Sequence, residues 1–494
     1  MAPKARDPAP LPPFHVDPTA LAALGRLWEA GHAAYLVGGA VRDGLLGRES
    51  DKPDMDLATS ARPEQVVALF PGGKNQNQFG TVVAGPIEIT TFRRDRTYSD
   101  HRRPDEVTFT EDVLEDLVRR DFTVNAIAWG REGDAAQLPD FVDPTSGRAD
   151  LEARVLRAVG EPSARFQEDA LRLLRAARLA AQVGLTIEPA TLAAMKERAA
   201  DASYLSGERI GMEIERLLRA GQPSVGLRIL ADTGILEAIL PELAAQRGVP
   251  QSKIPGHDLW DHTLGTVDAA VALHPADRRL AMAALLHDAG KPETFVDGHF
   301  RGHPEAGAAI AREVLGRIAY PSRDAAHVRR LIEEHMFQYL PGWSDAAVRR
   351  FMRRVGPELV DDLVRLRQAD NVGSGLPPDA GDLAELRDRI TGERERMAPL
   401  SLGDLAVDGD DLQAEVGVRP GPWLGTLLDR LLDSVVNDPK RNTRERLLMD
   451  ARRWHTAEGA GTAGGLGTAK GAGTAGGAGT AEDVGADPDG APAQ

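Results

Sequence analysis

The sequence predicts an α+β protein, in which a small α/β domain precedes a long helical region. Segments that are rich in Val, Ile and Thr and bounded by Gly or Pro, which is typical of strands, occur before about residue 150. From residue 151 onward, apolar residues recur almost throughout at helical spacing. The chain of 494 residues is also too long for one hydrophobic core, which indicates three or four domains.

The N-terminal domain is expected to follow residues 1–16, a Pro-rich segment that we expect to be flexible. Residues rich in Val, Ile and Thr on either side of Gly85-Pro86 predict two strands joined by a turn. Helical spacing and short apolar runs predict the other elements. In sequence order we expect helix 19–31, strand 33–39, a helix start at 41–47, strand 54–59, helix 63–70 and two strands within 81–94.

The helical region begins with its strongest prediction, FQEDALRLLRAARLAAQVG at residues 166–184. The apolar spacing predicts one helix, which Gly184 would end. Residues 280–291 and 325–336 are also predicted helices. Residues 457–494 form a Gly/Ala/Thr repeat with an acidic end, which cannot bury a core and which we expect to be disordered.

The composition excludes several classes of protein. The chain contains no cysteine, which excludes disulfides and thiolate zinc sites and agrees with a reducing cytoplasm. It has no apolar run of about 18 residues and no apolar signal core, so we expect neither a membrane span nor secretion. The net charge of −16 argues against nucleic-acid binding by the whole surface, but arginines cluster at 93–103, 119–120 and 165–178.

One stretch, YLVGGAVRDGLLGRESDKPDMDLAT, combines two features that bind charged groups. Gly38 and Gly39 lie between a strand and a helix start, where glycine lets backbone N–H groups approach an anion. Arg42 adds a fork suited to phosphate. Asp54 and Asp56 alternate by two on a predicted strand, so both carboxylates leave one face and favour Mg²⁺ or Mn²⁺. The glycines alone would also fit a tight turn, and the two carboxylates alone would fit a solvated strand end. Together they predict a site for a nucleoside triphosphate and a metal.

This stretch and four later motifs resemble the family of bacterial CCA-adding tRNA nucleotidyltransferases and poly(A) polymerases, whose head is polymerase-β-like. The motifs keep the family order over residues 35–183. The resemblance implies a nucleotidyltransferase head in which two metals help an RNA 3′-hydroxyl to attack the α-phosphate of a nucleotide. One departure is DPTSG, where the family more often has a bulkier residue and a Gly pair. The later motifs are EITTFRRDRTYSDHRRPDEVTF, LEDLVRRDFTVNAIAW, FVDPTSGRADLEARVLRAVG and RFQEDALRLLRAARLAA.

The resemblance also implies roles for individual residues. Asp54 and Asp56 would carry the metals, and Glu88 is the candidate for a third carboxylate on a neighbouring strand. Asn125 would be structural or lie near the sugar. For the arginines of the RRD motif, the alternative to nucleotide binding is that they form a basic face beside the acidic segment EDVLEDL. The predicted nucleotide-binding set is Gly38, Gly39, Arg42, Arg119, Arg120, Asp121, Asp169, Arg172, Arg175 and Arg178.

Within that set, Asp169 and Arg172 are predicted to choose the base. Three positions apart on one predicted helix, they would share a face. Asp169 can accept from the exocyclic amine of cytosine or adenine, and Arg172 can donate to the neighbouring ring nitrogen. Guanine and uracil present a carbonyl instead, which would leave buried polar groups unpaired. The alternative is a surface salt bridge between the two residues. The resemblance supports base selection, with Arg175 and Arg178 near the nucleotide.

A second set of motifs, GHDLWDHTLGTVD, LLHDAGKPET, RGHPEAGA, IEEHM and RQADN, resembles the HD phosphohydrolase superfamily. Imidazole and carboxylate ligands favour a divalent transition metal such as Mn²⁺, Ni²⁺, Co²⁺ or Fe²⁺. The resemblance implies a phosphatase or phosphodiesterase acting on nucleotides or RNA ends. We expect ordinary roles for His257, His274, His299 and His327. The predicted ligands are His262, His287, Asp288 and Asp370, with His303 and His335 for a second metal.

The combined prediction is a cytoplasmic, template-independent enzyme that adds or repairs the 3′-terminal CCA of tRNA from CTP and ATP, with an HD phosphohydrolase attached. The tRNA would be held by shape and backbone. Three alternatives remain: a poly(A) polymerase, for which a basic tail is expected; a CC-only enzyme, which would lack part of the segment complete here at 97–117; and a phosphohydrolase whose head only binds RNA. The predicted domains are flexible segment 1–16, head 17–150, helical neck and RNA-binding region 151–250, HD domain 251–375, C-terminal helical body 376–456 and disordered tail 457–494.

Overall fold

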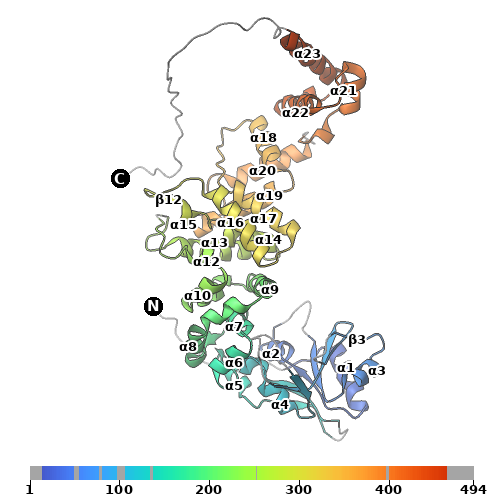
Figure 1. Ribbon diagram of the computed structural model, residues 1–494, viewed down its shortest axis with the longest axis vertical. Helices are drawn as coiled ribbons and strands as arrows, with labels where there is room; N and C mark the ends of the chain where they lie inside the picture. Colours follow the sequence, from blue (N-terminus) through green and yellow to red (C-terminus); the bar gives the residue numbers. More distant parts are fainter. Residues whose placement is uncertain are drawn as a thin grey trace, which may run out of the picture. The chain divides into compact units, whose positions relative to one another are not determined.

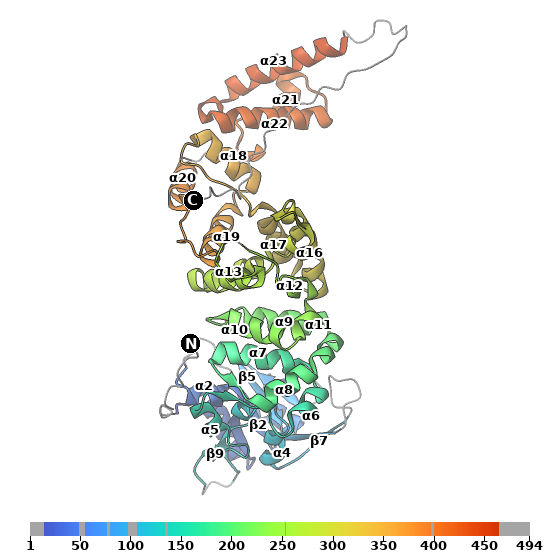
Figure 2. The same ribbon diagram turned by 90° about the vertical axis from the view of Figure 1, so that its left-hand side faces the viewer.

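The computed structural model describes residues 14–48, 55–76, 80–96, 106–133, 137–251, 253–396 and 400–463. The chain forms two compact units, Met1–Gly392 and Glu393–Gln494, which we describe separately. The first unit contains a sheet domain followed by two groups of helices (Figures 1 and 2). The predicted α+β class, with an α/β domain ahead of a helical region, is confirmed.

The N-terminal domain is built around a mixed sheet with the strand order β3-β4-β5-β2-β1-β8-β9. β2 and β5 run parallel, whereas the other neighbouring pairs are antiparallel. All four side chains of the interior strand β1, AYLV, are buried, because α1 and α2 contact it. The strands are β1 (Ala34–Val37), β2 (Asp56–Thr59), β3 (Lys74–Asn75), β4 (Thr81–Ala84), β5 (Ile87–Thr91), β8 (Ala128–Arg131) and β9 (Asp140–Val142).

Helices and a separate β-ribbon complete this domain. The ribbon pairs β6 (Arg93–Arg96) with β7 (Glu106–Phe109). Every element predicted for the domain is present, including the two strands on either side of Gly85. Phe14 lies in the segment that we expected to be flexible, yet its ring packs 5.6 Å from Trp129 and 5.1 Å from Phe141. The helices are α1 (Pro18–Glu29), α2 (Gly39–Leu45), α3 (Pro63–Leu69), α4 (Val113–Val118), α5 (Gly147–Glu152) and the 3₁₀ turn Thr123–Asn125.

The predicted helix over 166–184 is wrong as a single element. The chain forms α6 (Pro162–Glu168) and α7 (Leu171–Val183), with Asp169 extended between them at φ −149° and ψ 105°. The Asp169 carboxylate accepts a hydrogen bond from the backbone N–H of Leu171, so it satisfies one of the free donors at the start of α7. Gly184 ends α7 in the left-handed region at φ 75°, as predicted. The break turns Asp169 away from the regular helical face.

The remaining helices of the first unit form the neck and the region with the HD motifs. α10 contacts both α7 and α13, and so links the two groups (Figures 1 and 2). Two-residue strands, β10 (Val155–Leu156) with β11 (Thr186–Ile187) and β12 (Phe295–Val296) with β13 (His299–Phe300), were not predicted. The helices are α8 (Pro189–Glu197), α9 (Gly207–Leu217), α10 (Pro223–Asp232), α11 (Ile235–Ile239), α12 (Pro241–Ala244), α13 (Leu259–Leu273), α14 (Arg278–Leu286), α15 (Lys291–Thr294), α16 (His303–Arg317), α17 (Ser322–Glu334), α18 (Asp345–Val355), α19 (Val360–Gly373) and α20 (Leu383–Glu395).

Close backbone contact joins the neck to the HD region. A Cβ at Gly211 of α9 would lie 2.2 Å from the carbonyl oxygen of Ile318, so only glycine permits this approach. On the neighbouring side, Ser224 donates to Asp268 of α13 through both its backbone N–H (2.9 Å) and its hydroxyl (2.6 Å). Arg317 pairs with both oxygens of Glu242 at 2.8 and 2.7 Å. These contacts fix the helices that carry the two candidate sites.

The second unit is helical, with α21 (Gly409–Val416), α22 (Pro422–Asn437) and α23 (Arg444–Ala463). Their apolar faces share one core that includes Leu412, Leu431 and Leu447. α23 continues past residue 457, where we expected the disordered tail to begin, and residues 464–494 lie outside the described ranges. Within the described ranges, every helix is too short or too polar to traverse a lipid bilayer.

Candidate active site and metal centre

A cavity of about 1040 Å³ lies between the head sheet and the neck helices. It is open enough for a nucleotide, since ligand pockets commonly measure roughly 300–1,000 Å³. Every described residue of the predicted head set lines it, although these residues come from β2, β5, α2 and the residue before it, the loop after α4, the break between α6 and α7, and α7. Those residues are Gly38, Gly39, Arg42, Asp56, Glu88, Arg119, Arg120, Asp121, Asp169, Arg172, Arg175 and Arg178.

Two carboxylates meet on the sheet side of this cleft. Asp56 opens β2 and stands opposite Glu88 of β5 in the parallel register. Paired residues of neighbouring strands point to one face, and both side chains line the cleft. The predicted partner Asp54 lies outside the described residues. The Asp56–Glu88 pair offers hard oxygen ligands from two strands, which fits Mg²⁺ or Mn²⁺.

Gly38 allows the arginine side of the cleft to approach these carboxylates. Its backbone has φ 69° and ψ −131°, a conformation that favours glycine. A Cβ at this position would lie 3.2 Å from Nη1 of Arg120 and 3.9 Å from Oδ2 of Asp56. The glycine therefore leaves room where a cation and an anion of the site converge.

Asp116, which the sequence analysis did not single out, holds the two arginines of the RRD motif. Its Oδ1 lies 2.6 Å from Nη2 of Arg119, and its Oδ2 lies 3.1 Å from Nη2 of Arg120. Burial opposes the ionisation of Asp116, but the two guanidinium groups outweigh it and lower its pKa to about 2. The spacing of Asp116 from the arginines, three and four residues on a helical turn, was a signal that could have identified it.

Asp121 is buried and organises a second arginine. Its Oδ2 accepts from Nε (2.8 Å) and Nη2 (2.6 Å) of Arg175, and its Oδ1 accepts from Nδ2 of Asn125. Burial again opposes ionisation, but Arg175 and Asn125 hold the pKa of Asp121 far below its usual range. Asn125 also accepts from Nη1 of Arg42 at 2.7 Å, and Asp43 takes two further donors of Arg42. Arg42 thus reaches the cleft with three of its five N–H donors already used.

The predicted base-reading pair has different partners from those that we considered. Both oxygens of Asp169 accept from Nη2 of Arg209, at 2.9 and 2.8 Å. Arg172 is buried, pairs with Glu168, and donates to the carbonyl oxygens of Arg165 and Arg119. Arg209 comes from α9, far along the chain, so sequence spacing gave no signal for it. Asp169 and Arg172 therefore do not form the salt bridge that was the alternative. Asp169 pairs with Arg209, and Arg172 pairs with Glu168.

The neck supplies further arginines that the sequence analysis missed. Arg178 donates through Nε to Glu213 of α9 at 2.6 Å, and Arg216 pairs with the same carboxylate at 3.3 Å. Arg216 and Arg219 line the cleft together with Arg178. The cleft therefore has acidic residues on the sheet side and a basic neck side, which is the charge distribution that a metal-bound nucleotide requires.

The HD motifs form a separate, buried cluster. Nε2 of His262 lies 3.2 Å from Nε2 of His287, 3.3 Å from Oδ2 of Asp288 and 3.2 Å from Oδ1 of Asp370. Nε2 of His287 lies 3.1 Å from Oδ2 of Asp288. Four potential ligand atoms, from the two helices α13 and α19 and from the turn after α14, thus converge, as the predicted ligand set requires.

The two remaining histidines adjoin the other oxygen of the same aspartate. Nε2 of His303 and Nε2 of His335 lie 3.3 Å apart, and each lies 3.7 Å from Oδ1 of Asp288. The two triads, His262-His287-Asp288 and Asp288-His303-His335, each bring three ligand atoms within 4.8 Å of one another. Each triad offers imidazole nitrogens and a carboxylate oxygen, a donor set that suits a divalent transition metal.

Second contacts orient the ligand rings of this cluster. Nδ1 of His287, His303 and His335 each faces a backbone carbonyl oxygen, at 2.8, 2.7 and 2.6 Å, which leaves Nε2 pointing at the cluster. Burial lowers the pKa of His303 to about 4 despite the nearby carboxylate of Asp288, so its ring is neutral at pH 7. Burial opposes the ionisation of Asp370, but His262 and Lys253 hold its pKa well below its usual range. The histidines and this ionised carboxylate together suit a divalent cation.

Family comparisons divide the chain in the same order as these sites. The Poly A polymerase head domain family matches residues 34–157, and the HD domain family matches residues 259–373. The family described as "Probable RNA and SrmB- binding site of polymerase A" matches residues 184–247, and a tRNA nucleotidyltransferase domain matches residues 337–451. Both the head and the HD region thus match classes that depend on divalent metal ions.

The chain is similar to curated proteins over most of its length. The CCA-adding enzyme of Geobacillus stearothermophilus is 35% identical, over 90% of this chain and 98% of that protein. The A-adding tRNA nucleotidyltransferase of Deinococcus radiodurans is 33% identical, over 81% of this chain and 91% of that protein.

Solved structures agree with this likeness. The crystal structure of the Bacillus stearothermophilus CCA-adding enzyme in complex with CTP is 29% identical and superposes with a TM-score of 0.66, over 90% of this chain and 100% of that chain. The Thermotoga maritima CCA-adding enzyme complexed with tRNA_CCA, at 20% identity and a TM-score of 0.52 over 89% of this chain and 96% of that chain, shares the fold.

Proposed function

Because the chain belongs to the family of CCA-adding enzymes, we propose that it adds the 3′-terminal CCA to tRNA from CTP and ATP, as a template-independent nucleotidyltransferase. The observation that carries the proposal is the cleft, where the acidic edge formed by Asp56 and Glu88 faces the arginines of the neck across a nucleotide-sized space. We place this reaction in the cytoplasm, where tRNA, CTP and ATP would meet.

In the proposed reaction, the 3′-hydroxyl oxygen of the RNA forms a bond to the α-phosphorus of the nucleotide, and the bond to the bridging oxygen of the β-phosphate breaks. Pyrophosphate leaves, and the hydroxyl proton passes to solvent. Asp54, Asp56 and Glu88 would hold Mg²⁺, which when bound neutralises charge on the triphosphate and activates the hydroxyl. Arg120 and Arg175, held in place by Asp116 and Asp121, would bind the phosphates from the opposite side.

Base selection would rest on Asp169. Its carboxylate lines the cleft and is oriented by Arg209, so an oxygen can accept the exocyclic amine of cytosine or adenine. Arg172 keeps two N–H donors beyond the three that bind Glu168 and backbone carbonyls, and one of these would donate to the ring nitrogen. UTP and GTP would present an acceptor to the Asp169 carboxylate.

The test uses the purified full-length protein and three RNA substrates: tRNA ending at the discriminator base, at C and at CC. Each labelled nucleotide is supplied alone and in combination, and the added 3′ sequence is read. The proposal expects CCA on the first substrate and a stop after A. Addition of A only to the CC-ending tRNA would identify an A-adding enzyme, addition of CC without A would identify a CC-adding enzyme, and long A tails would identify a poly(A) polymerase.

We also propose that the HD region, residues 251–375 of the predicted domains, is an independent phosphohydrolase. The six-residue cluster, in which Asp288 belongs to both triads, supports this second function. A divalent transition metal such as Mn²⁺, Ni²⁺, Co²⁺ or Fe²⁺ would polarise a phosphate ester and a bound water. The test is metal-stimulated release of phosphate from 2′-nucleotides, 2′,3′-cyclic nucleotides or phosphorylated RNA ends. No release with any of these metals and substrates would contradict the proposal.

A further inference from the structure

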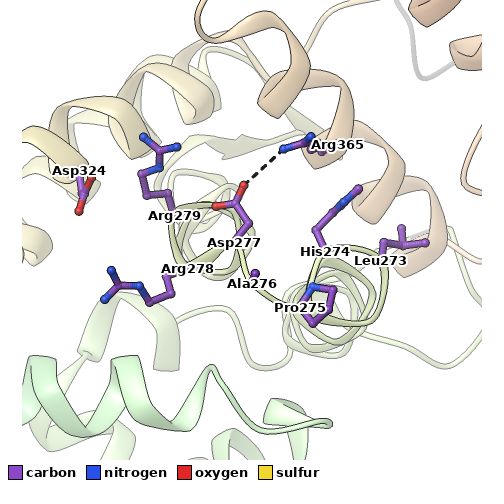
Figure 3. A pocket seen from close by; sticks show the side chains of 9 residues that line it. All are labelled: Leu273, His274, Pro275, Ala276, Asp277, Arg278, Arg279, Asp324 and Arg365. Carbon is purple, nitrogen blue, oxygen red and sulfur yellow. Dashed lines mark ion pairs between the residues drawn. The ribbon is translucent and has the colours of Figure 1, made fainter. Parts of the chain in front are cut away.

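A second cavity, of about 660 Å³, lies on the HD region where α13, α14, α17 and α19 come together. Figure 3 shows the arginines Arg278, Arg279 and Arg365 around it, with Asp277 between them. These residues belong neither to the metal cluster nor to the nucleotide cleft. A cavity edged by three cations in a chain of net charge −16 marks a local surface for an anion.

The arginines of this cavity are accessible, as are Arg216 and Arg219 on the neck side of the cleft, whereas the deepest cleft arginines are buried. The side chains of Arg278, Arg279 and Arg365 are 56%, 39% and 43% exposed, whereas that of Arg172 is 11% exposed. Arg279 has a long ion pair, 3.7 Å, with Asp362. Such pairs contribute little at a surface, so a phosphate that offers a charged acceptor can compete with them.

Two carboxylates beside these arginines, Asp277 and Asp362, are already engaged, and a third, Asp324 of α17, also lines the cavity. Asp277 caps α14 by accepting from the backbone N–H of Leu280, and pairs with Arg365 at 3.7 Å (Figure 3). Asp362 is bound by His327 at 2.8 Å and by Arg365 at 3.1 Å. Their oxygens face these donors, which leaves the outer N–H groups of the arginines for a ligand.

A line of arginines connects this cavity with the nucleotide cleft. Glu213 joins Arg178 to Arg216, and both arginines line the cleft. Glu215, on the same helix, joins Arg219 of the cleft to Arg278 of the second cavity. The two cavities are therefore neighbours across α9, linked by alternating arginine and glutamate side chains.

We propose that Arg278, Arg279 and Arg365 bind the sugar-phosphate backbone of the RNA whose 3′ end occupies the cleft. This inference rests on the proposed function, because an RNA end in the cleft must leave it along a neighbouring surface. Arginine forks on an accessible surface match regularly spaced phosphates and read no sequence. The surface therefore serves the tRNA stem and not the single nucleotide that is added.

The test replaces Arg278, Arg279 and Arg365 together by Gln and measures the Kd for full-length tRNA over a range of salt concentrations. We expect the Kd to rise about tenfold, and the slope of log K against log salt to fall by about 2 to 3, because each lost phosphate contact removes nearly one released counterion. The KM for CTP and the rate of addition to saturating tRNA should stay unchanged. The triple Lys variant, which keeps the charge, should restore most of the binding.

The matched control replaces three other arginines of the HD region and of α20, Arg312, Arg330 and Arg387, by Gln, since this makes the same change in net charge away from the cavity. Equal tRNA binding by the two Gln variants would overturn the inference. If the triple variant does not fold, the single variant Arg279→Gln serves as the test. Its slope of log K against log salt should fall by about 1. Failure of wild-type protein to add nucleotides would contradict the proposed function, whereas the binding comparison would still judge the inference.

Discussion

Asp56 and Glu88 lie side by side on neighbouring strands, and their charges face the same cleft. Two carboxylates this close repel each other unless a cation lies between them. We therefore expect Asp56→Ala to abolish nucleotide addition, measured as CMP transfer to tRNA, while thermal unfolding changes little. Asp140→Ala, at an exposed carboxylate outside the cleft, is the control. Near-normal CCA addition by the Asp56 variant would remove Asp56 from the metal site.

Arg209 approaches Asp169 from another part of the chain and fixes the direction of its carboxylate. Arg209→Ala should lower kcat/KM for CTP and ATP about tenfold, the scale of one charge-assisted hydrogen bond. It should also reduce discrimination against UTP and GTP, because a freely rotating carboxylate no longer presents one acceptor. Arg209→Lys should keep part of the wild-type kcat/KM and part of the discrimination against UTP and GTP. Arg198→Ala, which removes a neck ion pair with Asp201, is the control, and equal fidelity of the two Ala variants would contradict this role.

The ionised carboxylate of Asp116 predicts how the stability of the fold depends on pH. Its pKa of about 2 lies below the value of about 3.9 in an unfolded chain, so its ionised form stabilises the fold by about 2 kcal/mol. This contribution is complete above about pH 5 and is lost as the pH falls through 3.9 toward 2. Asp116→Asn should unfold earlier in urea at pH 7 than wild type, and the gap should narrow between pH 4 and pH 3. A gap that stays constant or widens on acidification would show that the carboxylate is not ionised in the fold.

At the scale of elements, the sequence predicted α1, α2 and α3 and the strands β1, β2, β4 and β5 of the head, but neither its later helices and strands nor the break at Asp169. The apolar spacing of 166–184 continues through the break, because both α6 and α7 bury their apolar sides in the same neck. A side chain that binds Arg209 on another helix and the backbone N–H of Leu171 outweighs helix propensity here. Such a contact depends on the packing of α9, which no local pattern contains.

The packing of α9 can be tested at its glycine. A methyl group at Gly211 would meet the carbonyl oxygen of Ile318 at 2.2 Å, so α9 and the end of α16 must move apart. We expect Gly211→Ala to lower stability by about 1–3 kcal/mol, as overpacking does, despite the better helix propensity of Ala. Gly316→Ala, at a helical glycine with open space around it, is the control and should be neutral or stabilising. Calorimetry of both variants measures the difference, and equal melting temperatures would contradict the close contact.

At the scale of the whole molecule, the order of motifs predicted two sites, and the structure places their residues in two separate groups. The six residues that the motifs predicted as metal ligands of the HD region lie together in one cluster. Two positioning residues were missed for different reasons: Asp116 lies inside the motif LEDLVRRDFTVNAIAW but was not singled out, and Arg209 comes from α9, outside every quoted motif. The motifs thus indicate which chemistry is present, and tertiary contacts decide how its groups are held.

The separation of the two groups predicts that their activities can be removed independently. Asp288 belongs to both triads of the HD cluster and His287 to one of them, and neither residue lines the nucleotide cleft. Replacing both with Ala should therefore remove tightly bound transition metal, measured by elemental analysis of the purified protein, together with any phosphohydrolase activity. CCA addition should keep its wild-type rate, because Asp56 and Glu88 supply their own carboxylates from the head sheet. His299→Ala, in the same region but outside the triads, should change neither. Loss of CCA addition by a folded double variant would show that the HD centre acts on the transferase and is not independent of it.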